Sequence, residues 1–284
     1  MSEPTPAIAT TIDYLVPTSK INRRFWAPGE EFNTGEYAPY PVTIRNARIA
    51  GPITLDSHGF TLARHETAVT DWEANYGPRC AYADEVCVAV ERLTGADFVI
   101  PMGGMIRSSG LTGPTVQPPA AEAHVDFTTR SANRIARMLY DKARPSGEGY
   151  DRFIAFSLWR ALSPPPQDMP LAMCEGGSVR DDEGTANTKV DVAEIPTGDA
   201  LFADIPGEEE MAAATIFHHS PDHKWWYFPD MTGDEVILIK FHDSDHSRAW
   251  RAPHTAFRDT TRADAVERRS MEYRGVAYFT RDAA

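Results

Sequence analysis

Apolar side chains recur at helical spacing in two segments of the chain. In residues 81–94, Val86 and Val90 lie four positions apart, and Gly95 follows as a stop. Residues 129 to about 143 show the same periodicity. The pattern therefore predicts one helix at 81–94 and a second at 129–143.

From residue 153 onward the pattern changes to short apolar runs separated by Pro, Gly and Asp clusters. The expected strands are 153–162, 171–174, 213–217, 225–228, 235–241 and 271–279, with one more at 98–101. Such a series of short strands favours a sandwich or barrel over alternating βαβ units. The fold class predicted is mainly β with flanking helices.

Three segments lack clear periodicity. Residues 1–57 are rich in proline, which predicts an extended N-terminal arm that wraps the core and holds at most short strands such as 42–49. Residues 102–119 contain several glycines and prolines and are expected to form a loop. The acidic segment 180–207 is expected to be a surface insertion.

The order of these elements favours one domain over residues 1–284, with a β-barrel core and a helical flank. The chain has 284 residues, of which 42% are hydrophobic, so two smaller domains divided near residue 120 remain an alternative.

Charge and cysteine content narrow the function classes. With 28 basic and 41 acidic residues the formal net charge is −13, and no stripe of Lys and Arg is present, so neither nucleic acid nor an anionic membrane is an expected partner. The three cysteines show no CxxC spacing, which argues against a disulfide framework or a cysteine zinc site. The first eleven residues lack a leader pattern, and no apolar run approaches the roughly 18 residues of a membrane span. We expect a cytoplasmic protein that handles a small molecule; the sequence does not indicate its oligomeric state.

His124 and Asp126 are candidate metal ligands. They are separated by one residue, so on a strand both side chains leave the same face and can chelate one ion. The pattern is short, and the alternative is that the pair caps the following helix. A 2-His-1-carboxylate site needs one more histidine and leaves open positions on Fe(II) for a bidentate 2-oxo acid and for oxygen.

His254 is the preferred third ligand, because it lies downstream in the order that such a site requires. His242, in a stretch dense in potential ligands, is the main competitor, and its place after an apolar run is also explained by a polar strand end. His218, His219 and His223 remain further alternatives.

Arg268 and Ser270 are candidate anchors for the far carboxylate of a 2-oxo acid. The planar guanidinium of Arg makes two charge-assisted bonds to a carboxylate, and a serine two residues on along a strand adds a donor from the same face. The alternative for Arg268 is a solvated surface residue beside Arg269.

Three further residues are weaker candidates for substrate binding. Arg160 lies inside an apolar run, and an arginine that faces a barrel interior needs a carboxylate partner, either from the protein or from a substrate or co-substrate. Lys240, at the end of another apolar run, raises the same question. Trp225 starts an aromatic cluster that is more typical of core packing than of a substrate site.

Short motifs along most of the chain resemble one protein family. They are 59–62, 93–96, 124–126, 158–162, 169–174, 225–229, 234–240, 243–244, 254–257 and 268–272. In order and number they resemble the Fe(II)/2-oxoglutarate-type oxygenases grouped with the cephalosporin methoxylation protein, the gibberellin desaturase-like proteins and the AsaB-type fungal hydroxylases.

The resemblance implies a double-stranded β-helix, a jelly-roll core, with iron at one mouth held by His124, Asp126 and His254. It implies 2-oxoglutarate anchored by Arg268 and Ser270, with molecular oxygen as the second co-substrate. The expected activity is hydroxylation of a small organic molecule, such as an amino acid or a natural-product intermediate. Desaturation or cyclisation at the same iron site, a jelly-roll binding protein without redox turnover, and a hydrolase or isomerase with another divalent metal are the alternatives.

Overall fold

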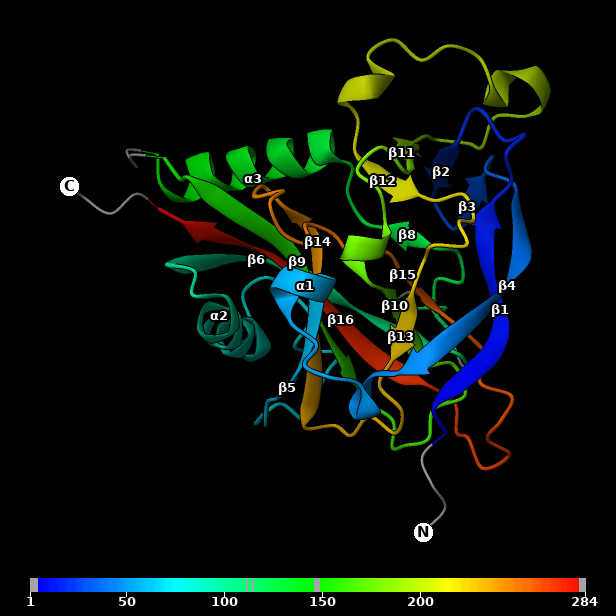
Figure 1. The fold of residues 1–284 in the computed structure, drawn as a ribbon. Coiled ribbons are helices and arrows are strands. Elements are labelled where there is room, and N and C mark those ends of the chain that lie inside the picture. Colours follow the sequence, from blue (N-terminus) through cyan, green and yellow to red (C-terminus); the bar gives the residue numbers. More distant parts are fainter. Residues whose placement is uncertain (1–4, 111, 114, 146–148, 281–284) are drawn as a thin grey trace.

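The chain forms two β-sheets with helices against them (Figure 1). The computed structural model describes residues 5–110, 112–113, 115–145 and 149–280. In spatial order, the larger sheet contains β1 (Ala7–Leu15), β4 (Tyr37–Asn46), β13 (Trp225–Tyr227), β10 (Leu171–Cys174), β15 (His254–Ala256), β8 (His124–Val125), β12 (Ala213–Ile216), β11 (Thr185–Asp191), β2 (Arg23–Ala27) and β3 (Glu30–Asn33). The smaller sheet contains β5 (Phe60–Arg64), β14 (Glu235–Asp243), β9 (Arg152–Ala161), β16 (Arg269–Phe279), β6 (Phe98–Ser108) and β7 (Val116–Gln117). Short helical turns are α1 (Leu55–His58), η1 (Ala47–Ile49), η2 (Gly176–Ser178), η3 (Gly198–Leu201) and η4 (Glu208–Glu210).

Both predicted helices are confirmed. Helix α2 (Ala81–Thr94) packs Val86 and Val90 on the outer face of the smaller sheet, and Gly95 ends it in the left-handed conformation, with φ of 74°. Helix α3 (Thr129–Ala143) begins with a capping box in which Thr128 accepts a bond from the backbone of Ser131. Thr128 is therefore the N-cap, and Asp126 is free for another role.

The core lies between the two sheets. On β9, Phe153 and Ala155 pack inward with residues of the larger sheet and α3, whereas Phe156 and Leu158 pack outward against α2. Because β9 is buried on both faces, its sequence is an almost continuous apolar run. The predicted architecture, mainly β with flanking helices, is confirmed.

The N-terminal arm contains longer strands than expected. β1 and β4 pair with each other along their whole length at one end of the larger sheet, while β2 and β3 form its other end. The expectation of at most short strands is therefore wrong. Pro39 and Pro41 of β4 both lie opposite β1, the edge strand of the sheet. Residues 1–4 of the predicted arm lie outside the described residues.

Two predicted non-strand segments also contain strands. β6 continues through Pro101 to Ser108, because Met102 forms a bulge against Arg274 and Gly275 of β16 that absorbs the irregular backbone. Residues 111 and 114 of the predicted loop lie outside the described residues. The segment 180–207 contains β11, which lies between β12 and β2 in the sheet, so it is not solely a surface insertion. β11 consists mainly of small and polar residues, so it lacks the apolar alternation that predicts a strand.

Candidate functional site

His124, Asp126 and His254 converge on one point at the inner face of the larger sheet. His124 on β8 and His254 on β15 are direct partners in adjacent antiparallel strands, and their ring centroids lie 4.5 Å apart. Asp126 follows His124 by two residues, and its Oδ1 lies 3.5 Å from His124 Nε2 and 3.9 Å from His254 Nε2. The candidate ligand atoms all lie within 4.8 Å of one another. Two ligands at about 2.1 Å from one ion, at right angles, lie roughly 3 Å apart, so small side-chain shifts would close this set on a metal.

Hydrogen bonds on the far side of each ring orient both histidines. His124 Nδ1 lies 2.9 Å from the carbonyl oxygen of Glu122, and His254 Nδ1 lies 3.2 Å from that of Ala252. A carbonyl can only accept, so each Nδ1 carries a proton and each Nε2 is the ring atom directed toward Asp126. Although burial opposes it, the carboxylates of Asp126 and Glu122 raise the pKa of His124, so a metal ion would displace a proton from its Nε2. Burial, with the neighbouring His124, lowers the pKa of His254 to about 4, which keeps that ring neutral.

The carboxylate of Asp126 is held from behind by Arg274. Arg274 Nε lies 2.8 Å from Asp126 Oδ2, which leaves Oδ1 directed at the histidines. Although burial acts against ionisation, the Arg274 guanidinium lowers the pKa of Asp126, so the carboxylate is charged. Arg274 also binds Glu272, which accepts a 2.8 Å hydrogen bond from Arg107 Nε on β6.

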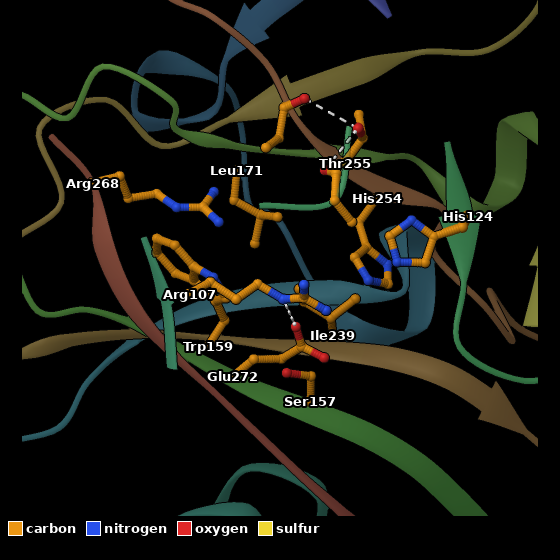
Figure 2. Close-up of a pocket in the computed structure, with 12 residues that line it drawn as sticks. Arg107, His124, Ser157, Trp159, Leu171, Ile239, His254, Thr255, Arg268 and Glu272 are labelled. Atoms are coloured by element: carbon orange, nitrogen blue, oxygen red, sulfur yellow. Dashed lines mark hydrogen bonds and ion pairs between the residues drawn. The ribbon is translucent and has the colours of Figure 1, made fainter. Parts of the chain in front are cut away.

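A pocket extends from the histidine rings to Arg268 (Figure 2). Arg268 points into it from one end, the rings of His124 and His254 close the other, and Glu272 and Trp159 form part of the wall. Arg268 is 1% exposed and lies over the Trp159 ring, with 5.6 Å from its guanidinium carbon to the ring centroid.

Several polar atoms around this pocket have no protein partner. The Arg268 guanidinium donates from Nη1 to the carbonyl of Met169 at 2.9 Å, but its Nε is buried without a partner. The hydroxyl of Ser157, which lines the pocket, and that of Ser270, which lies between Arg268 and Glu272 in the sequence, are also buried without a partner among the described residues. Because buried polar groups are normally hydrogen-bonded, these orphaned atoms fit a polar ligand between Arg268 and the histidines.

A larger chamber of about 430 Å³ lies on the other side of the triad. His124 and Arg107 line both spaces, whereas Asp126 and Arg274 line the chamber alone. The rest of its wall comes from β2, β6, β7, β11 and β12 and from the segments beside β8 and β12, which contribute Glu122 and Phe127. The triad thus lies at the junction of a narrow pocket and a chamber large enough for a small organic molecule.

Comparisons with known proteins identify the family of the chain. A family model described as "Oxidoreductase/YMDC permease-like domain" matches residues 12–278. The chain is 27% identical to the hydroxylase/desaturase efuI of Hormonema carpetanum, over 96% of either chain. It is 32% identical to the hydroxylase/desaturase CTB9 of Cercospora beticola, over 78% of this chain and 71% of the relative. It is 27% identical to the Fe(II)/2-oxoglutarate-dependent dioxygenase nvfI of Aspergillus novofumigatus, over 88% of this chain and 87% of the relative.

The chain belongs to this family of Fe(II)/2-oxoglutarate-dependent oxygenases. The predicted resemblance is thereby confirmed, as are the enzyme class and the cofactors Fe(II) and 2-oxoglutarate. A solved structure of the iron and alpha-ketoglutarate-dependent endoperoxidase NvfI superposes with a TM-score of 0.75 at 22% identity, covering 97% of this chain and 99% of that one. This likeness confirms the jelly-roll fold. Among the helices that the structure describes, none is long and apolar enough to cross a membrane.

Arg160 of the oxygenase does not face the barrel interior, so that prediction is wrong. Its side chain lies on the outer face of β9, where Nε donates to the Tyr82 hydroxyl at 3.0 Å and the other nitrogens contact His65 and the carbonyl of Gly233. No carboxylate among the described residues pairs with it; its N–H groups donate instead to the uncharged acceptors just named. Alternation along β9 turns Arg160 toward α2 and Trp159 toward the pocket.

Lys240 and Trp225 are also bound within the protein. Lys240 lies on the outer side of β14, and its ammonium donates to Asp243 Oδ2 at 2.7 Å and to the carbonyl of Ala249 at 3.1 Å. Trp225 is 1% exposed and donates from Nε1 to the Tyr14 hydroxyl at 2.8 Å. Neither residue lines the pocket or the chamber, so the structure offers no contact for the substrate role predicted for them.

The competing histidines lie elsewhere in the described structure. His242 packs against His246 and Trp250, with ring centroids 5.3 Å away in each case. His219 and His223 pack against Tyr14. Of these histidines, His254 is the one whose ring lies beside His124 and Asp126, and its role as the third ligand stays a prediction.

Sequence reasoning missed Glu272 and Arg274. The signal was the alternation already used for Arg268 and Ser270, since every second residue of an extended segment faces the same side. Continuing that alternation by four residues puts Glu272 and Arg274 on the same face as Arg268 and Ser270, which is the face predicted to line the iron site.

Proposed function

We propose that His124, Asp126 and His254 hold Fe(II), and that Arg268 with Ser270 binds the distal carboxylate of 2-oxoglutarate. The observation that carries this proposal is that the two histidines of the triad and the partly unsatisfied guanidinium of Arg268 line one narrow pocket from opposite ends (Figure 2). A 2-oxo acid spans such a pocket with its chelating end on the metal and its far carboxylate on the arginine.

The bound iron and 2-oxoglutarate supply the oxidising chemistry, which removes hydrogen from an unactivated carbon. The protein orients the two histidines through their Nδ1 bonds and holds Asp126 through Arg274. The chamber then places a small organic molecule beside His124 and Asp126. We infer hydroxylation of an amino acid or a natural-product intermediate; desaturation and cyclisation begin with the same hydrogen removal.

We also propose that residues 1–284 act as one oxygenase domain. Glu272 and Trp159 reach the pocket from the smaller sheet, and Arg268 directly precedes a strand of that sheet. The two histidines come from the larger sheet, so neither sheet forms the pocket alone. The three cysteines are free, which fits the reducing cytoplasm proposed as its location.

Succinate formation tests this function. Purified protein given Fe(II), ascorbate, oxygen and 2-oxoglutarate is expected to form succinate, with a higher rate when a screened natural-product acid or amino acid is a substrate. The matched control is the Asp126→Asn variant, which keeps the side-chain shape and removes the anionic ligand. Succinate formation at the same rate in both proteins would contradict the proposal.

A further inference from the structure

A continuous row of side chains runs outward from the triad across the larger sheet. His254 pairs with His124, and His124 pairs with Ile216 on β12. Two residues back along β12, Ala214 pairs with Asn187 on β11. Because paired residues in adjacent strands share a face, the side chains of His124, Ile216, Ala214 and Asn187 line one wall of the chamber. This wall changes from a candidate metal ligand to apolar and then to polar groups.

The row ends in two cations. Lys189 on β11 and Arg24 on β2 are direct partners in adjacent parallel strands, and both line the chamber. Their charged groups flank the same ring, Trp26, with the Arg24 guanidinium 5.3 Å and the Lys189 ammonium 5.6 Å from its centroid. Like charges directly opposite each other destabilise a strand pair, so nearby anions stabilise this arrangement.

The existing partners of the two cations are weakly held. Lys189 pairs with Asp191 at 2.7 Å with side chains 46% and 73% exposed, and Arg24 pairs with Glu31, both 36% exposed. Exposed ion pairs contribute little free energy, so a ligand carboxylate can replace these partners at small cost.

Two uncharged polar groups in the same wall also lack partners. Asn187 Oδ1 and Trp26 Nε1 are buried without a hydrogen bond. Asn187 is 5% exposed, and its carboxamide Nδ2 donates one long hydrogen bond, of 3.5 Å, to the Tyr37 hydroxyl. Unsatisfied groups at this point fit a ligand with a polar substituent beside its anionic end.

Strand spacing sets the scale of such a ligand. Adjacent strands lie about 4.8 Å apart, so β11 is roughly 10 Å from β8 and β2 is roughly 14 Å from it. Between them the wall is formed by Ile216 and the small side chains of Ala213 and Ala214, with Phe127 and Met105 also lining the chamber.

We propose that the chamber binds an organic anion, with its anionic group at Lys189 and Arg24 and an apolar body extending to the triad. The proposal rests on the proposed function, because it makes this molecule the substrate whose carbon lies beside the metal. The oxidised carbon then lies roughly 10–14 Å from the anionic group, on the scale set by the strand spacing.

Two fluorescent dyes test this without metal or turnover. Anilinonaphthalenesulfonate and phenylnaphthylamine share the same apolar rings and differ by one sulfonate, so their affinities separate the anionic contribution from the apolar one. The full chain is expected to bind the sulfonate more tightly. The double variant Lys189→Gln with Arg24→Gln is expected to weaken sulfonate binding at least about tenfold and to leave the uncharged dye within about twofold.

Two controls give each result a definite meaning. Lys142→Gln with Arg137→Gln removes two charges from α3, outside the chamber lining, and is expected to change neither affinity. Ala214→Trp fills the chamber and is expected to abolish binding of both dyes. The proposal is overturned if the wild-type chain does not prefer the sulfonate, if the Lys189 and Arg24 double variant binds it unchanged, or if sulfonate binding survives Ala214→Trp. Since no metal is present, these results are independent of whether the iron assignment is correct.

Discussion

Replacing His254 by alanine is expected to abolish stoichiometric Fe(II) binding. The structure offers three ligand atoms at one point, and His254 supplies one of the two imidazole nitrogens among them. Its loss leaves an adjacent His and Asp, too few ligands to retain the ion through gel filtration, so we expect affinity to fall by at least about a hundredfold. Metal content per chain and anaerobic titration calorimetry with Fe(II) measure this directly.

His242→Ala is the matched control. Like His254, His242 is buried on a strand of the core, and its pKa is lowered to about 4, chiefly by burial. Removing it makes a similar cavity, but its ring packs against His246 and Trp250, away from Asp126. We expect comparable thermal destabilisation in the two variants and loss of iron in His254→Ala alone. Equal retention of iron by both would exclude His254 as a ligand.

Replacing Arg268 by glutamine is expected to weaken 2-oxoglutarate binding by about a hundredfold or more. The Arg268 guanidinium is buried beside Arg107, and burial lowers its pKa to about 9, so the charged form lacks compensation in the free protein. The carboxylate of a bound ligand would neutralise this charge. Removing one partner of a buried charge-assisted pair costs about 2–5 kcal/mol of binding free energy. Anaerobic calorimetry with the Fe(II)-loaded protein gives the dissociation constant.

Arg269→Gln provides the control for Arg268→Gln, because it is the neighbouring arginine with the opposite orientation. Arg269 pairs on the surface with Glu73 at 3.0 Å, with side chains 41% and 63% exposed. We expect Arg269→Gln to leave 2-oxoglutarate affinity within about twofold. Iron binding should survive in both variants, since neither arginine contacts the triad. If the Arg268 variant binds 2-oxoglutarate as tightly as wild type, the anchor assignment fails.

Local sequence signals predicted the helices and the first half of the site. Helical spacing at Val86 and Val90 depends on neighbours in the sequence, and so does the same-face placement of His124 and Asp126. The contribution of His254 depended on the order of motifs, because only the pairing of β15 with β8 brings its ring to Asp126.

The remaining features depend on long-range pairing that no local pattern reveals. Lys189 and Arg24 lie opposite each other because β11 and β2 pair in parallel, and these two strands come from distant parts of the sequence. Arg160 was assigned to the wrong face because β9 is buried on both sides, so apolar alternation could not show which side points inward. Its true surroundings, beside Tyr82 of α2, become apparent only when the helix is in place.

We propose that Fe(II) binds at the triad and that 2-oxoglutarate binds between the triad and Arg268. Anaerobic addition of 2-oxoglutarate to the Fe(II)-loaded protein, followed by visible absorption, tests it most directly, because a 2-oxo acid chelated to Fe(II) gives a charge-transfer band. We predict a band that saturates at one 2-oxoglutarate per iron in the wild-type protein and is absent when succinate replaces it. Wild-type protein that retains Fe(II) and shows no band at saturating 2-oxoglutarate would contradict the claim.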